Sequence, residues 1–467
     1  MLLLSICLRD ADFEVRIIKK VICFVHIARH LAHSWVRKST HSRCSGNCTL
    51  CLQIFNTYLP QNKYRLHIPL SMSFYYSLVP LISPAVAPIL VLVSSELASH
   101  QLALVWLTLW VFRLVFQFNN VSEGSLFRYL TVLLAVVCVR FFYASKTLSF
   151  YFLFEISIPP TLFLIVLFGY QPEKLTASSY LVLYTVLSSL PILLVLVSLP
   201  PHLSCLTSRV SLYVILALTL GFIVKTPMYL VHVWLPKAHV EAPVAGSIIL
   251  AGVLLKLGRY GLLVFLPLFL HGLLYLYICV SVVGGVVCSF ICARQWDAKG
   301  LIAYSSVVHI GVVRVGFVSG SELGYCCGIL IIVAHGICSP LLFGVAFFIY
   351  ENRHTRVLAQ NRGNLATPLV TFFVFILLAV NIGVPPFLNV WSEVLMFTAL
   401  FRLISWRVPF IIPLAFFAVL YNIVIYVILA HGKERPTVGT MISPWHYLRS
   451  ITLSLLLSFN INFFVIG

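Results

Sequence analysis

Long apolar runs dominate the chain from Phe74 to its end, and each is long enough to cross a bilayer as a helix. About 20 apolar residues cover the ~30 Å of hydrocarbon. The runs do not alternate apolar and polar residues, which argues against a β-barrel. The pattern predicts an all-α, polytopic transmembrane helix bundle of about thirteen spans. Their expected limits are 74–96, 101–118, 125–143, 147–169, 175–199, 210–231, 244–265, 269–293, 299–318, 322–350, 366–403, 408–430 and 446–466.

Prolines interrupt two of these runs. Pro227 lies inside the sixth, and Pro385 and Pro386 divide the eleventh, which is too long for one straight span. Proline removes a backbone donor and clashes with the preceding turn, so we expect two broken helices. One interrupted span in each half of the chain is typical of transporters built from repeated halves.

Residues 1–72 differ from the rest, which predicts a basic amino-terminal extension followed by a transmembrane domain over 73–467. The extension holds ten Lys or Arg and only three acids, and no run within it reaches spanning length without a charge. This composition is also that of a transit peptide. We expect a retained, lineage-specific extension that replaces a lost first helix.

The composition is typical of a membrane protein, and it changes how the positive net charge is interpreted. Of the 467 residues, 61% are hydrophobic and 9% are charged, whereas a soluble domain carries roughly a quarter charged residues. The net charge of +18 therefore indicates basic loops at membrane surfaces rather than nucleic-acid binding.

Loop charge predicts the orientation. One side collects nine basic residues and the other four, and the richer side faces the cytoplasm or the mitochondrial matrix. Thirteen spans then place the extension on the matrix side and Gly467 on the opposite side. The nine are Lys174, Lys237, Arg294, Lys299, Arg353, Arg356, Arg362, Lys433 and Arg435, and the four are Lys146, Arg209, Arg402 and Arg407.

A few ionisable residues lie inside the predicted spans, where such residues are rare. Each charge at mid-membrane costs ~2.5–3.5 kcal/mol, so it persists only with a partner, water or a function. One alternative is structural ion pairs between helices; another is side chains whose charged ends reach the membrane surface. The candidates are Glu155, Lys225, Lys256, His309, His335 and Glu393.

The residue types favour proton transfer. Burial lowers the pKa of a lysine and raises that of a glutamate, so both approach neutral pH and can change protonation. Histidine titrates near neutrality without such help. Arginine stays charged, so we interpret Arg113 and Arg314 as structural. Lys225 and Glu393 also lie close to the proline breaks, where freed backbone groups can hold water.

With these residues placed, the chain resembles the subunit-4 family of mitochondrial NADH–ubiquinone oxidoreductase (respiratory complex I). Members of that family form one of the three antiporter-like, proton-pumping subunits of the membrane arm. The strongest match is VKTPMYLVHVWLPKAHVEAPVAGSIILAGVLLKLGRYGLL (224–263). Further matches are FGYQPEKLTASSYLVLYT (168–185), DAKGLIAYSSVVHIGVV (297–313), AHGICSPLLFGVAFFIYENRHTR (334–356) and VPPFLNVWSEV (384–394).

The resemblance implies an ordered proton relay and an antiporter-like fold with two inverted repeats of five helices. Glu155 would pair with Lys225 on a broken helix, and Lys256 would be the central lysine. His309 and His335 would pass protons to Glu393, the terminal residue on the second broken helix. His232 would line the water path.

The resemblance also implies the setting. The chain would be a subunit of the H⁺-translocating NADH:ubiquinone reductase in the mitochondrial inner membrane, without redox chemistry or a cofactor of its own. FMN and iron–sulfur clusters would belong to other subunits. Expected partners are the two paralogous antiporter-like subunits, supernumerary subunits and phospholipid such as cardiolipin, and no nucleic acid. A related cation/proton antiporter and a non-pumping spacer stay open as alternatives.

Some features depart from the family pattern. Thirteen spans are expected here against fourteen in the family, and residues 1–72 match nothing in it. Arg259 and Arg314 stand where small or apolar residues are usual. In the extension, His41 precedes Cys44, Cys48 and Cys51. Thiolate and imidazole are zinc ligands, but the spacing is not that of the usual paired motif, and unpaired thiols are the alternative.

Overall fold

Helices make up nearly all of the chain that the computed structural model describes, as expected from the apolar runs. The structure describes residues 99–118, 124–198, 212–265, 271–319, 321–365, 368–385, 387–403, 411–432 and 451–452. All the contacts below lie within one unit, His100–Phe463. The helices are α5 (Ser99–Phe118), α6 (Ser125–Phe142), α7 (Thr147–Ile156), α8 (Ile158–Phe168), α9 (Lys174–Ser198), α10 (Leu212–Lys225), α11 (Trp234–Glu241), α12 (Val244–Ile249), η3 (Leu250–Leu254), α13 (Leu255–Phe265), α14 (His271–Ala293), α15 (Ala298–Val318), α16 (Glu322–Arg353), α17 (Pro368–Ile382), α18 (Leu388–Leu403) and α19 (Ile411–Ala430).

The described helices confirm a multi-pass membrane protein. Among the described residues, eight helical stretches are long and apolar enough to cross a bilayer, and three more are apolar but shorter. The predicted spans 74–96 and 446–466 lie outside the described residues, apart from Ile451 and Thr452. The total of thirteen spans therefore stays a prediction, as does the inverted repeat.

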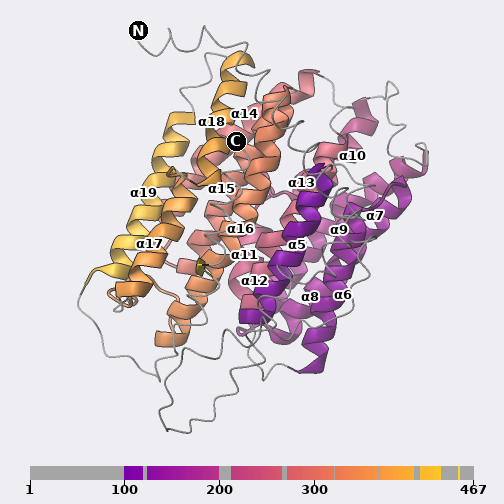
Figure 1. Cartoon of the computed structure of the whole chain (residues 1–467). Helices are drawn as coiled ribbons and strands as arrows, with labels where there is room; N and C mark the ends of the chain where they lie inside the picture. Colours follow the sequence, from indigo (N-terminus) through magenta and orange to yellow (C-terminus); the bar gives the residue numbers. More distant parts are fainter. Residues whose placement is uncertain are drawn as a thin grey trace, which may run out of the picture. The chain divides into compact units, whose positions relative to one another are not determined.

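Both predicted helix breaks are present. α10 ends at Lys225, two residues before Pro227, and α11 begins at Trp234. The Trp234 indole donates to the carbonyl of Val224 at 3.0 Å, so it satisfies a backbone acceptor that the break leaves free. The other break separates α17 from α18, and Figure 1 shows α18 above α17 in the orange part of the ribbon.

A third break was not expected. The predicted span 147–169 is confirmed as one membrane-long helical stretch, Thr147–Phe168, but it has an unexpected interruption at Ser157, where α7 ends and α8 begins. The cause is Pro159 and Pro160, which lack the N–H groups that would bond the carbonyls of Glu155 and Ile156 in a continuous helix. The break therefore lies directly beside one of the candidate proton carriers.

The predicted span 244–265 is confirmed as one stretch, Val244–Phe265, and its middle is a π-helical turn. η3, at Leu250–Leu254, joins α12 to α13 and ends two residues before Lys256. Single π turns are rare and frequently occur at functional sites. Residues on both sides of the turn are buried, so this irregular segment lies inside the bundle.

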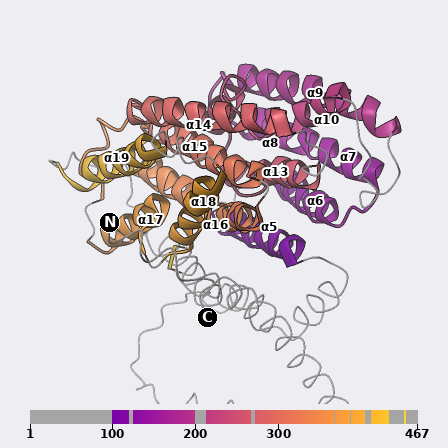
Figure 2. The ribbon, with the colours of Figure 1, turned by 90° about the horizontal axis from the view of Figure 1, so that it is seen from above.

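The helices fall into two groups. Seen from above, α6–α10 lie on one side and α14, α15, α17 and α19 on the other, with α13 and α16 between them (Figure 2). The segment α12–α13 is among the most buried candidate spans, together with α15 and α16. Candidate proton residues on these central helices are therefore shielded from lipid.

Close packing at Gly258 holds α13 against the α10–α11 break, which gives a first prediction. A Cβ there would lie 2.8 Å from Thr226 Cγ2 and 3.3 Å from Thr226 N. We expect Gly258→Ala to destabilise the fold by ~1–3 kcal/mol through overpacking, and to lower the yield of folded protein recovered from membranes. Gly124→Ala is the control, because nothing lies within 4 Å of its Cβ. Equal yields from both variants would contradict this interpretation.

Candidate functional site

Lys225 reaches from one helix break to another. Its side chain is 5% exposed. The ammonium donates to the Phe154 carbonyl at 2.7 Å and to Ser157 Oγ at 3.4 Å, and it lies 3.3 Å from the centre of the Phe154 ring. The end of α10 is thus fixed to the α7–α8 break by a charge-assisted hydrogen bond.

Glu155 lies next to this contact but does not form the implied direct ion pair. Within the described residues, the one ion pair shorter than 4.0 Å joins Arg356 to Glu241. One Glu155 oxygen is buried without a hydrogen-bond partner. The carboxylate still acts on Lys225 through space, so the two charges interact without touching.

A small cavity continues inward from Lys225. It measures about 20 Å³ and is lined by Lys225, Trp234, Leu250 and Leu254, with the hydroxyls of Ser157, Thr161 and Thr185 among the other lining groups. A cavity of this size with polar partners has room for a water molecule. It therefore separates Lys225 from the π turn by a space that water can occupy.

Lys256 is the central charge of the site and is 1% exposed. Its ammonium contacts the carbonyl of Ala251 in η3 and lies 3.5 Å from His335 Nδ1. A π turn shifts the backbone hydrogen bonds by one residue. The carbonyl that accepts from the Lys256 ammonium, that of Ala251, belongs to this irregular turn. The π turn thus helps to position this lysine.

Two histidines continue the line from Lys256. The rings of His309 and His335 are 5.3 Å apart between centroids, and both residues are buried. The side chain of Asn381, the last but one residue of α17, interacts with His309. Three of the candidates, Lys256, His335 and His309, are therefore brought into one cluster.

Asparagines link this cluster to the second break. The Asn381 amide donates to Asn422 at 3.0 Å, and Asn389 donates to the Asn381 carbonyl at 3.4 Å. A cavity of about 20 Å³ beside them is lined by Ser305, Asn381 and Asn422 among others, enough for a water molecule. Asn389 and Glu393 stand four residues apart on α18 and so share one face.

The Glu393 carboxylate folds back onto the break. A Cβ at Gly383 would lie 2.9 Å from Glu393 Oε2 and 3.1 Å from Oε1. Gly383 has φ +86°, a conformation that glycine adopts readily and other residues avoid. Glycine is therefore needed here both for the backbone turn and for the room that the carboxylate takes.

His232 lies inside the α10–α11 break. It is buried, stacks on Tyr229 with centroids 5.6 Å apart, and meets Tyr304 edge-on at 6.0 Å. Its Nδ1 is buried without a partner among the described residues. A role for His232 in a water path stays a prediction.

His239 was missed from the sequence because it falls between two predicted spans. It is fully buried in α11, and neither ring nitrogen has a hydrogen-bond partner in the described part of the chain. It interacts electrostatically with Lys256 and with His335. Asn381 and Asn422 were missed as well, because the sequence was searched for ionisable groups. The signal for all three was a polar residue bordering or interrupting an apolar run.

The arginines have other surroundings. Arg314 donates to the Pro227 carbonyl at 3.3 Å, which supports a structural role at the break. Arg113 lies over the Trp110 ring at 5.6 Å. Arg259 is fully buried near Arg314, and its three guanidinium nitrogens have no hydrogen-bond partner among the described residues. Fixed positive charge therefore flanks the Lys256 cluster.

Metal binding finds no support in the described part. The candidate ligands His41, Cys44, Cys48 and Cys51 lie outside the described residues. Among those that are described, no group of three or more His, Cys, Asp or Glu side chains is placed to hold a metal ion. Zinc binding by the extension stays a prediction.

Comparisons with known proteins agree with this geometry. Residues 144–420 match the transmembrane family of NADH:quinone oxidoreductase and Mrp antiporter subunits. NADH-ubiquinone oxidoreductase chain 4 of Ceratitis capitata is 42% identical over 353 residues, which cover 71% of this chain and 78% of that protein. The chain 4 protein of Lumbricus terrestris is 38% identical over 340 residues, covering 69% and 74%.

Solved structures show the same fold at lower identity. A chain in respiratory complex I from Thermus thermophilus gives a TM-score of 0.68 at 24% identity, covering 78% of this chain and 80% of that one. A chain in the Mrp complex from Dietzia gives 0.74 at 15% identity, covering 84% and 89%. By the family match and by its identity to these relatives, the chain belongs to the family of NADH-ubiquinone oxidoreductase chain 4, a group of antiporter-like membrane subunits.

Proposed function

We propose that this chain is a membrane-arm subunit of complex I and moves protons across the mitochondrial inner membrane through its buried Glu/Lys/His relay. NADH:ubiquinone electron transfer in other subunits supplies the energy. One observation carries the proposal. Ionisable groups lie near all three helix breaks and between them: Lys225, Lys256, His335 and His309 are buried, and Glu155 and Glu393 are partly buried.

The first step is electrostatic. Two unit charges a few ångströms apart interact more strongly inside a protein than in water, and Glu155 acts on Lys225 without touching it. A change in their separation therefore changes how firmly Lys225 holds its proton. The ammonium rests on a backbone carbonyl of the α7–α8 break, a junction that can move without breaking a regular helix.

The following steps run through nitrogen atoms. A neutral Lys256 accepts a proton and becomes an ammonium, and His335 Nδ1 at 3.5 Å is the nearest ring nitrogen that can take it onward. His335 then faces His309. Water in the cavity beside Asn381 and Asn422 extends the path towards Glu393. Each acceptor returns to its starting form when it passes its proton on.

The two alternative functions, a separate cation/proton antiporter and a non-pumping spacer, predict different features of the chain. A separate cation/proton antiporter fits the fold shared with the Mrp complex chain, but the identity of about two-fifths to chain 4 relatives favours complex I. A non-pumping spacer would have no need to bury lysines that each cost ~2.5–3.5 kcal/mol in the membrane. The buried Lys256 and its histidine neighbours therefore argue against the spacer.

The setting follows from the same proposal. The chain holds no redox cofactor, and FMN and iron–sulfur clusters belong to other subunits of the complex. Its partners are other membrane-arm subunits, including the two paralogous antiporter-like ones and supernumerary subunits, with cardiolipin among the surrounding lipids. The side of the membrane that carries Lys299 and Arg356 faces the matrix, because basic loops stay on that side.

The test is the effect of Lys225→Ala and Glu155→Gln on proton pumping by the purified complex in liposomes. We expect pumping through this subunit to fall about a hundredfold for Lys225→Ala, the usual contribution of a positioned proton-transfer group, and to fall clearly for Glu155→Gln. Lys237→Ala is the matched control, because that lysine is exposed and rests on the Tyr180 ring. Unchanged pumping in an assembled Lys225→Ala complex would favour the spacer.

A further inference from the structure

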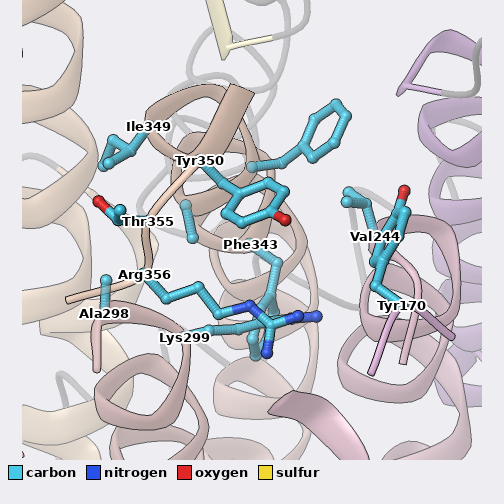
Figure 3. A pocket seen from close by; sticks show the side chains of 11 residues that line it. Tyr170, Val244, Ala298, Lys299, Phe343, Ile349, Tyr350, Thr355 and Arg356 are labelled. Carbon is cyan, nitrogen blue, oxygen red and sulfur yellow. The ribbon is translucent and has the colours of Figure 1, made fainter. Parts of the chain in front are cut away.

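A water-sized cavity opens at the basic end of the helices, outside the relay. It measures about 30 Å³, and its lining includes Tyr170, Val244, Lys299, Tyr350 and Arg356. Figure 3 shows the Arg356 side chain extending across the cavity below Tyr350, with Tyr170 and Val244 on the opposite wall. The volume is enough for water, and the charged and phenolic groups provide it with partners.

The rim of this cavity is held by charged groups on three elements. Arg356 forms an ion pair with Glu241 at 3.9 Å. Lys299 donates to the carbonyls of Val240 and Ala242 at 3.1 and 2.6 Å. Burial raises the pKa of Glu241 above its ordinary value, against the opposing effect of Arg356. The corner between α11 and α12 is thus fixed beside the cavity by two cations.

The floor of the cavity is one aromatic ring. Phe343 lines the cavity on one side. On the other side it stacks on His239, with centroids 4.6 Å apart and planes inclined by 11°. His239 is 0% exposed and neither ring nitrogen has a partner among the described residues. The charge of Lys256 acts on the His239 imidazole, and the Phe343 ring lies between that imidazole and the cavity.

The cavities at Lys225 and at Asn381 differ from this one in their lining. Arginine is absent from their linings, and the one lysine among them is Lys225, which already belongs to the relay. The cavity at Arg356 combines basic loop residues, water-sized space and contact with a relay neighbour. Of the three cavities compared, it is the one whose lining combines basic loop residues with a ring stacked on His239.

We propose that this cavity is the port through which protons from the basic side reach the relay, with Phe343 as the barrier and His239 as the first acceptor. The inference rests on the proposed function. When the Phe343 ring turns aside, a hydronium ion in the cavity gives a proton to one nitrogen of neutral His239 and becomes water. The imidazolium then gives the proton from its other nitrogen to His335 or to neutral Lys256, and neutral imidazole is restored.

The decisive test blocks the cavity after the complex has assembled. In a Thr355→Cys variant the new thiol lies in the cavity lining, and a small cationic thiol reagent is added from the basic side of complex-containing vesicles. We expect labelling to abolish most of the NADH-driven proton uptake that passes through this subunit, seen as fewer protons taken up per NADH. Trp296→Cys is the control: Trp296 lies on a neighbouring turn, is 74% exposed and is not among the lining residues. Unmodified complex with the same reagent gives the background from native cysteines.

Each contrary result overturns the port. The cavity is not open to water if the thiol of the Thr355→Cys variant resists the reagent, and it carries no protons if that thiol is labelled but pumping continues. An equal loss after labelling of the Trp296→Cys variant would show that the reagent acts elsewhere. Because Lys225→Ala tests the relay itself, continued pumping by a labelled complex together with failure of the lysine variant rejects the port and leaves the proposed function standing.

The barrier has its own test, because two phenylalanines line the cavity and one touches His239. Phe343→Ala should leave NADH oxidation intact but lower the number of protons moved per NADH, since a port that stays open lets loaded protons return. Phe347→Ala removes the same ring from the same lining and should leave the ratio unchanged. The barrier role is refuted if the two variants give the same ratio.

Discussion

Replacing Lys256 by arginine will stop proton pumping as completely as replacing it by methionine. The ammonium is buried against the Ala251 carbonyl and lies 3.5 Å from His335 Nδ1. In the proposed relay it must lose its proton in every cycle. Arginine keeps the positive charge but does not release a proton under protein conditions. Methionine keeps much of the volume and carries no charge.

We expect both variants to slow proton transfer through this subunit about a hundredfold or more. The measurement is the initial rate of NADH-driven acidification in liposomes that contain equal amounts of assembled complex. Arginine is larger than lysine, so assembly is checked first on native gels, and the methionine variant covers the case in which arginine does not fit. Full pumping by the arginine variant would mean that Lys256 acts as a fixed charge.

Gly383→Ala will lose most of the pumping through this subunit although it removes no ionisable group. The backbone at Gly383 has φ +86°, and a Cβ there would lie 2.9 Å from Glu393 Oε2. Holding alanine in this conformation costs ~1–3 kcal/mol, and the new methyl group must displace the carboxylate. The terminal acid of the relay would then point away from the break, so the loss should approach that of Glu393→Gln.

Gly432→Ala separates this effect from backbone strain alone. Gly432 also has a positive φ, +135°, but its Cβ would meet Arg362 and no relay residue. Pumping per assembled complex is measured for both glycine variants beside Glu393→Gln. Normal pumping by Gly383→Ala, together with loss of pumping in Glu393→Gln, would contradict the prediction. It would show that the Glu393 carboxylate carries protons without its contact with Gly383.

Hydropathy and proline position predicted much of the fold because both act locally. The breaks after Lys225 and before Leu388 lie beside prolines, which weaken a helix at that point. Proline alone does not decide the matter, because α9 and α16 continue through Pro191 and Pro340. The interruption at Ser157 was missed because the apolar run continues unbroken across Pro159 and Pro160. In the structure these prolines lie in the first turn of α8, a position in which proline is tolerated. The π turn leaves no mark in composition, since all five of its residues suit a regular apolar helix.

The candidate site was predicted as a set of residues but not as a set of contacts. Glu155, Lys225, Lys256 and Glu393 stand out because charge is rare in a bilayer. That Lys225 bonds to Phe154 rather than to Glu155, and that Asn381 meets His309, depends on residues far apart in the chain. His239 escaped notice because its segment was interpreted as a connection between spans.

The π turn at Leu250–Leu254 also affects how sequences of this family should be aligned. Each residue of a helix advances the chain by about 100° around its axis, and a π turn corresponds to one inserted residue. A relative that lacks one residue here could form a regular helix and still present its lysine in the same direction. A relative of equal length without the π turn would instead turn the lysine by about 100°, away from the histidine that follows it in the relay. An alignment of this segment should therefore allow a gap of one residue before the lysine.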